Sequence, residues 1–134
     1  MLPVDTARAL RDAGLRWTPS NGDQFVVPDR GMDEQVFVLS DMTIEVQDHP
    51  AGPIIKFNGT TEWALDSLEQ SDALWVPAEH QLRHLLGATF VRLERSGDSY
   101  TVVAVVDGSE SPARAETAEE AYGRALLDLL QSLA

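Results

Sequence analysis

The residues from Thr117 to the C-terminal end of the chain constrain the fold more strongly than any other part of the sequence. Thr117 and Glu120 have the spacing of a capping box, in which each side chain accepts a hydrogen bond from a backbone N–H at the start of a helix. An apolar stripe follows at helical spacing, formed by Ala118, Tyr122, Leu126, Leu129 and Leu133. Because such a stripe is stable only against another apolar surface, this helix is expected to pack on a sheet.

The segment before this helix predicts a β-hairpin. Residues 89–94 and 100–106 have the composition of strands, and residues 95–99 between them are rich in turn formers. The apolar run at residues 102–106 predicts burial on both faces of its strand. The hairpin is therefore expected at the centre of the sheet.

The N-terminal half of the chain predicts one short helix followed by a meander of four strands. The helix opens at Asp5 and Thr6 and ends at Gly14, where a Schellman-type cap is expected. The strands are expected at residues 24–27, 35–39, 42–47 and 54–57, with connections too short for parallel crossovers.

Helical spacing returns after residue 58 and predicts two short helices. The first helix is expected to contain Trp63, Leu65 and Leu68, and the second to contain Leu82, Leu85 and Leu86. Pro77 precedes the second helix and Gly87 follows it, and both residues favour helix ends at these positions.

The complete order is helix, four strands, two helices, two strands and helix. This order predicts an α+β fold with an antiparallel sheet of about six strands, helices packed against it and the C-terminal helix on the sheet. The chain has no internal repeat and no long linker, so residues 1–134 are expected to form a single domain.

The composition limits the classes of partner. The 22 acidic and 10 basic residues give a net charge of −12, which repels nucleic acids and anionic membranes. The chain has no cysteine, and neither a signal-peptide core nor an apolar run of membrane-spanning length stands out, so a cytoplasmic location is expected. A homodimer is one arrangement that the sequence allows.

The sequence offers few catalytic candidates. It lacks the glycine-rich loop that cradles phosphates and the nucleophile elbow of serine hydrolases, so no catalytic residue and no cofactor are predicted. His80 and His84 are four residues apart and could supply two metal ligands from one helix face. A third ligand would still be needed, and His49 could approach only through the tertiary fold. A solvated helix face is the simpler interpretation of the pair.

Two features are candidates for binding a protein partner. Asp29, Asp33 and Glu34 belong to a series of acidic residues around the ends of the predicted strands that matches no calcium loop. Turn formation and solubility explain these residues, and a docking surface for a basic partner is the alternative. Trp75 lies in a predicted connector and belongs either to the core or to a partner surface.

Several segments resemble a known group of proteins. Residues 10–17 (LRDAGLRW), 57–65 (FNGTTEWAL) and 75–77 (WVP) are similar to small actinobacterial proteins often labelled as pilus assembly proteins. Residues 116–126 (ETAEEAYGRAL) resemble, more weakly, small phage-type α/β sandwich domains. Neither resemblance implies a catalytic residue, and the first implies an association with pilus assembly by label alone.

Three functions remain open from the sequence. The leading hypothesis is a non-enzymatic protein-interaction domain, because an acidic field occurs without an active-site constellation. The second is an immunity-type protein that neutralises a basic toxin. The third is a metal-binding or small-molecule-binding enzyme that uses His80 and His84.

Overall fold

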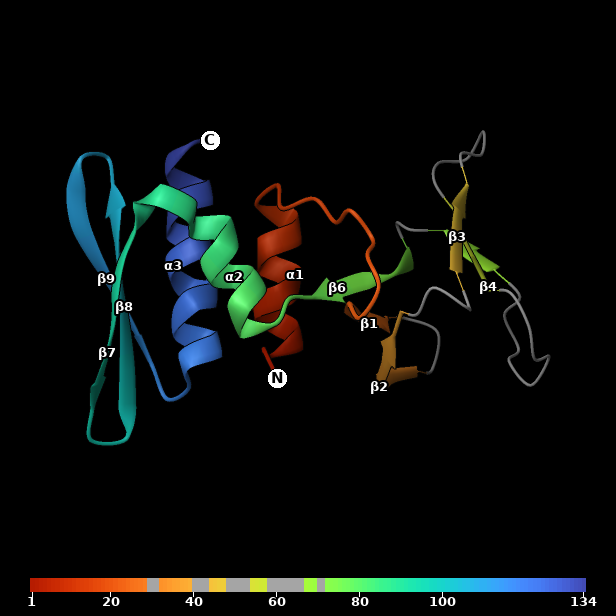
Figure 1. Ribbon diagram of the computed structural model, residues 1–134, viewed down its shortest axis with the longest axis horizontal. Helices are drawn as coiled ribbons and strands as arrows, with labels where there is room; N and C mark the ends of the chain where they lie inside the picture. The colour runs from red at the N-terminus through yellow and green to blue at the C-terminus, as the bar shows by residue number, and fades with distance from the viewer. Residues whose placement is uncertain (29–31, 40–43, 48–53, 58–66, 70–71) are drawn as a thin grey trace. The chain divides into compact units, whose positions relative to one another are not determined.

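The computed structural model describes residues 1–28, 32–39, 44–47, 54–57, 67–69 and 72–134 (Figure 1). At residues 32–34, 44–47, 54–57 and 67–69 it describes the backbone alone. The chain divides into two compact units. We call Met1–Arg16 together with Val76–Ala134 the terminal unit, and Trp17–Trp75 the central unit.

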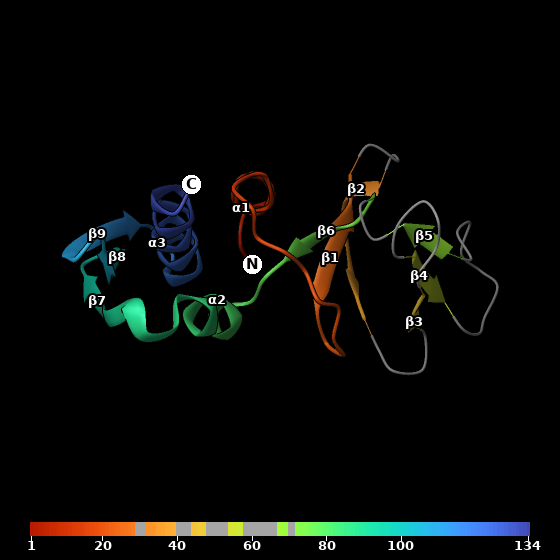
Figure 2. The ribbon, with the colours of Figure 1, turned by 90° about the horizontal axis from the view of Figure 1, so that it is seen from above.

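The terminal unit contains one antiparallel sheet and three α-helices. The strands are β7 (Phe90–Ser96), β8 (Ser99–Val106) and β9 (Ser109–Ala115), in the order β7-β8-β9. The helices are α1 (Val4–Asp12), α2 (Glu79–Leu86) and α3 (Ala118–Ser132), and a 3-10 turn, η2 (Gly87–Thr89), links α2 to β7. The helix α3 packs against β8 and β9 and lies between the sheet and α1 (Figures 1 and 2). The predicted packing of the C-terminal helix on a sheet is confirmed.

Only half of the predicted capping box forms at the start of α3. The Thr117 hydroxyl accepts a hydrogen bond from the backbone N–H of Glu120 at 3.1 Å. The Glu120 carboxylate instead accepts from the Thr6 hydroxyl at 2.8 Å and from Arg124 Nε at 3.2 Å. Glu120 therefore fastens α1 to α3. Leu133 also departs from the predicted stripe, because it lies beyond α3 and is 75% exposed.

Gly123 allows α1 and α3 to approach closely. A Cβ atom at this position would lie 2.8 Å from Leu2 Cδ1 and 2.9 Å from Thr6 Cγ2. Both distances are shorter than an ordinary van der Waals contact, so only glycine fits here without movement of its neighbours. The predicted Schellman end of α1 is also present, because Leu15 N–H donates to Leu10 C=O at 2.9 Å and Gly14 has φ of 108°.

The predicted position of the hairpin at the centre of the sheet is correct for β8 alone, because β7 is an edge strand. β8 lies between β7 and β9, and Val102, Val103 and Ala104 are at most 4% exposed. The predicted burial on both faces does not extend over the whole run at residues 102–106, because Val105 is 37% exposed.

The sequence analysis missed β9. Its residues, SESPARA, include a proline and lack the β-branched and aromatic side chains typical of strands. The position of β9 beside β8 is determined by the two-residue turn before it, where Asp107 and Gly108 have φ of 52° and 80°. Positive φ at both positions is the geometry of a type I′ hairpin turn, for which Asp-Gly is a preferred pair.

The central unit adds strands in two further sheets. One sheet contains β1 (Gln24–Val27), β2 (Met32–Val38) and β6 (Leu74–Val76) in the order β2-β1-β6. The other contains β3 (Ile44–Gln47), β4 (Ile54–Phe57) and β5 (Ser67–Glu69) in the order β3-β4-β5. The α+β class is confirmed, and β1–β2 and β3–β4 pair antiparallel. A single sheet of about six strands is not confirmed, because the described strands form three three-stranded sheets.

The predicted helix at Trp63, Leu65 and Leu68 is wrong at Leu68. Leu68 lies in β5, where it pairs with Ile55 of β4, and the other two residues lie outside the described residues. The prediction failed because the segment is short, and apolar residues two and three positions apart fit both a strand and a helix.

The core of the first sheet of the central unit consists of Phe25, Val27, Leu39 and Ala73, with Trp17 and Phe37 packed against it. In the described part of the chain, none of the helices has both the length and the apolar composition that a membrane crossing requires.

Candidate functional site

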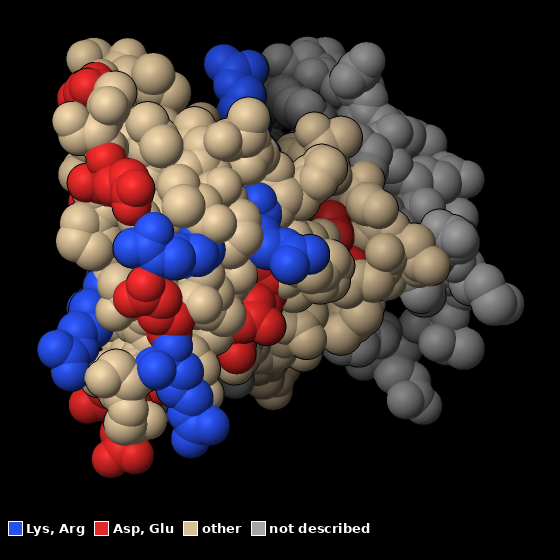
Figure 3. Space-filling view, turned by 60° about the vertical axis from the view of Figure 1, so that its left-hand side comes forward, with Lys and Arg blue, Asp and Glu red and all other residues tan. Residues whose placement is uncertain are grey.

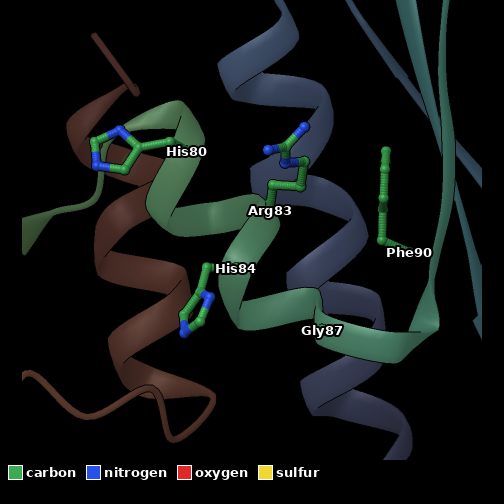
Figure 4. Close-up of a pocket in the computed structure, with 5 residues that line it drawn as sticks. All are labelled: His80, Arg83, His84, Gly87 and Phe90. Atoms are coloured by element: carbon green, nitrogen blue, oxygen red, sulfur yellow. The ribbon is translucent and has the colours of Figure 1, made fainter.

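A shallow pocket of about 580 Å³ lies against α2 in the terminal unit (Figure 4). Its lining residues are His80, Arg83, His84, Gly87 and Phe90. The helix that positions the first three begins after Ala78, whose N–H donates to Gln81 Oε1 at 2.9 Å, and ends at Gly87, with φ of 58°. Leu82 and Leu86 are buried on the opposite side of α2, so the two histidines and Arg83 face solvent.

The two imidazole rings do not converge within the described part of the chain. Figure 4 shows the imidazole rings of His80 and His84 pointing away from each other rather than toward a common point. Among the described residues there is no group of three or more His, Asp or Glu side chains that could hold a metal ion. His49 lies outside the described residues. The pocket therefore offers a cationic and aromatic surface more readily than a coordination site.

Beneath this pocket, Phe90 contacts Tyr122 of α3, with ring centroids 5.7 Å apart. Burial raises the pKa of Tyr122 above its ordinary value of 10.0, and nearby Glu79 raises it further while Arg83 lowers it. The phenol is thus held neutral as part of the packing between the sheet and α3.

Trp75 lies in an aromatic cluster of the central unit. Its ring stacks on Trp17 with centroids 6.5 Å apart and an interplanar angle of 12°. Trp17 in turn contacts Phe25 at 5.6 Å, and Phe25 contacts Phe37 at 5.4 Å. Trp75 is half-buried, and its indole Nε1 is buried without a hydrogen-bond partner. Its contacts are those of a packing residue, and they leave only part of the ring available to a partner.

A buried carboxylate fixes this cluster. Asp23 is 3% exposed, and its Oδ2 accepts hydrogen bonds from Trp17 Nε1 and from the backbone N–H of Ser20, both at 2.9 Å. The sequence analysis did not single out Asp23 from the other acidic residues near the strand ends. The signal that distinguishes it is its position immediately before a buried strand and six residues after a tryptophan.

The remaining partner-binding candidates are the acidic residues Asp29, Asp33 and Glu34. Asp29 lies outside the described residues, and Asp33 and Glu34 lie at the start of β2, in the three residues of that strand whose backbone alone is described. Their position in the chain is nevertheless informative, because the charge of the protein is unevenly divided between the two units.

The central unit contains 11 acidic and 2 basic residues, a net charge of −9. The terminal unit contains 11 acidic and 8 basic residues, a net charge of −3. Figure 3 shows arginine and acidic side chains interleaved over the described face that it displays. The strong negative field therefore originates in the central unit, and the terminal unit is close to balanced.

The sequence analysis also missed an exposed strand in the terminal unit. Along β7, Val91 is 42% exposed and Leu93 is 39% exposed, and Arg92 forms ion pairs with Glu94 and, at 3.0 Å, with Glu110 of β9. The hairpin was predicted, but the exposure of β7 depends on its place at the edge of the sheet, which the sequence does not specify.

Comparison of the chain with protein-family models, curated proteins and solved structures gave no match.

Proposed function

We propose that this chain is a non-enzymatic protein-interaction domain that binds a basic protein partner through the central unit. The observation that carries this proposal is the net charge of −9 on Trp17–Trp75, against −3 on the rest of the chain. A field of one sign attracts a partner of opposite sign, raises the association rate and disfavours nucleic acids and anionic lipids.

The proposal also draws on the scarcity of groups suited to catalysis. In the part of the chain that the structure describes, the only clustering of imidazoles is at His80 and His84, which are on an exposed helix face and do not converge. The partner is therefore expected to be recognised by charge and shape.

Two matched charge variants test the proposal. The first carries Asp29→Asn, Asp33→Asn and Glu34→Gln in the central unit, and the second carries Asp12→Asn, Asp98→Asn and Glu116→Gln in the terminal unit. Each variant loses three negative charges. Partners are captured by cross-linking in the native cells and then purified. Their association rates with the original chain and with both variants are measured at low and at high salt.

We expect the first variant to associate about tenfold more slowly and the second to remain within about twofold of the original chain, with both differences reduced at high salt. Equal losses in both variants would show that the central unit is not the docking surface. Recovery of no protein partner, together with turnover of a small molecule, would end the proposal.

An immunity-type protein is a narrower version of the same function, and the same segregated charge favours it. A concentrated acidic unit suits the basic cleft of an enzyme that acts on nucleic acid. Inhibition of the isolated partner's nuclease activity by this chain, with weaker inhibition by the first variant, would support this version.

The pocket at α2 favours a small-molecule function as the second candidate. Its test is the His84→Ala variant, because loss of a measured bound metal or activity would support that candidate. A metal-free native preparation with no activity to lose would remove it.

A further inference from the structure

The outer edge of β7, in the terminal unit, is an exposed sheet edge. β7 pairs with β8 on one side, and in the described structure no strand pairs with its other side. From Val91 to Ser96 every residue of the strand is exposed. An edge strand presents unpaired N–H and C=O groups, which are the groups that bind another strand.

The opposite edge of this sheet is less suited to pairing. β9 contains Pro112, which has no N–H to donate, whereas β7 has no proline. Of the two outer strands, β7 is therefore the one able to form a continuous ladder.

The hairpin turn determines which groups of β7 point outward. Ser96 and Ser99 flank a two-residue turn, in which only Gly97 has positive φ, so they form the hydrogen-bonded pair that closes the hairpin. Because hydrogen-bonded and non-hydrogen-bonded pairs alternate along an antiparallel ladder, Leu93 and Arg95 direct their N–H and C=O groups away from β8.

We propose that β7 pairs antiparallel with β7 of a second copy of this chain, about a two-fold axis at Leu93. In this register Arg92 of each copy lies opposite Glu94 of the other. The outward groups of Leu93 face those of the second Leu93, and Val91 lies opposite Arg95 of the second copy. Opposite charges directly across a ladder stabilise it, so the strand is complementary to itself.

Neighbouring registers lack this complementarity. Centring the pair on Arg92 sets two Arg92 side chains opposite each other, and centring it on Glu94 sets two Glu94 side chains opposite each other. Like charges directly opposite are destabilising. If the two-fold axis lies between two residues, the outward-directed backbone groups of one copy face inward-directed groups of the other, and no ladder forms. The irregularity between Phe90 and Arg92 limits the pairing to the stretch that begins at Val91.

The pairing joins the two three-stranded sheets into one of six strands. Leu93 aligns with Val102 of β8 and, through it, with buried Ala113 of β9, whereas Arg92 aligns with Val103 and exposed Pro112. The two Leu93 side chains therefore meet on the helix-covered side, while Arg92 and Glu94 meet on the other side. The dimer uses neither the central unit nor the pocket at α2, and it is independent of the proposed binding of a basic partner.

Charge exchange tests the pairing on the full chain. Four chains are compared, and all of them carry Glu110→Gln because Arg92 also pairs with Glu110. The first has no further change and serves as the original chain, and the others add Arg92→Glu, Glu94→Arg or both exchanges. Their masses are measured by sedimentation velocity over a range of concentrations, with circular dichroism to verify folding. We expect the original chain and the double exchange to rise from 14.7 kDa toward twice that mass, and each single variant to stay monomeric.

Mixing the two single variants provides the decisive measurement. The Arg92→Glu variant is acidic at both positions of the ladder and the Glu94→Arg variant is basic at both, so the charges facing each other across a mixed pair are opposite. The mixture is therefore expected to regain the doubled mass. An original chain that stays monomeric at every soluble concentration would overturn the proposal. A dimer that persists in either single variant would overturn it equally, because that dimer would use another surface.

Discussion

Asp23 stabilises the aromatic cluster of the central unit through two hydrogen bonds to a single carboxylate oxygen. The donors are Trp17 Nε1 and the N–H of Ser20, and the carboxylate is almost completely buried. Bonds to a charged group contribute more than neutral ones, and a buried donor that loses its acceptor keeps its full desolvation cost. The single carboxylate therefore orients the ring on which Trp75 stacks.

Replacement of Asp23 tests this role. Asp23→Ala is expected to lower the free energy of unfolding by about 3 kcal/mol, because two donors lose their acceptor. Asp23→Asn keeps a neutral acceptor and should lose about 1 kcal/mol. Urea unfolding followed by tryptophan fluorescence measures both values. Equal stability of Asp23→Ala and the original chain would show that solvent satisfies these donors.

Tyr122 gives the stability a dependence on alkaline pH. Burial raises the pKa of its phenol in the folded state above the value of 10.0 that applies when the chain is unfolded. The stability that this shift contributes is complete below pH 10 and is lost as pH rises through the folded pKa, since the unfolded chain then releases the proton first.

Tyr122→Phe should therefore flatten the loss of stability between pH 9 and pH 11, as measured by urea unfolding at several pH values. Tyr100→Phe is the matched control, because the other tyrosine is only half-buried. A Tyr122→Phe profile as steep as that of the original chain would assign the alkaline loss to other groups.

At the scale of elements, the contact between α1 and α3 depends on Gly123 and on the hydrogen bond from Thr6 to Glu120. A methyl group at position 123 would collide with Leu2, which is fully buried, and with Thr6. The gain in helix propensity from glycine to alanine, about 1 kcal/mol, opposes the cost of overpacking, about 1–3 kcal/mol. The collision is expected to dominate, because both neighbours are held in place.

Gly123→Ala should accordingly destabilise the chain by about 1 kcal/mol, as measured by thermal or urea unfolding. In the background of Leu2→Ala, which removes one colliding side chain, the same change should cost less or become stabilising. An equal cost in both backgrounds would show that Leu2 is not the obstacle.

The elements that the sequence predicted are those with local signals. Capping at Thr117, the end of α1 at Gly14 and the valine-rich β8 all depend on neighbouring residues, and the structure contains each of them. β9 has no strand-forming composition of its own, and its local signal is confined to the Asp107-Gly108 turn that brings it beside β8.

The same limit applies to the candidate site. His80 and His84 were correctly placed on one helix, but the directions of their rings depend on tertiary surroundings. The carboxylate of Glu120 turned to Thr6 because α1, more than a hundred residues away in sequence, supplies a better-placed donor. Tertiary contacts of this kind are invisible to a local pattern.

At the scale of the whole molecule, the division into two compact units bears on the expectation of a single domain. If residues 1–134 behave as one domain, calorimetry should give one transition whose van't Hoff and calorimetric enthalpies agree. Asp23→Ala would then lower the melting temperature of the whole chain. Two transitions, of which Asp23→Ala shifts only one, would show that the units unfold separately.

The order of the units along the chain also affects synthesis on the ribosome. α1 leaves the exit tunnel first, yet its packing partner α3 is translated last, so α1 has to wait while the intervening segment emerges. Residues 17–75 become available earlier and can begin to fold while α1 is still unprotected. Ala7 and Leu10, the buried residues of α1, therefore lack the cover of α3 until translation reaches the end of that helix.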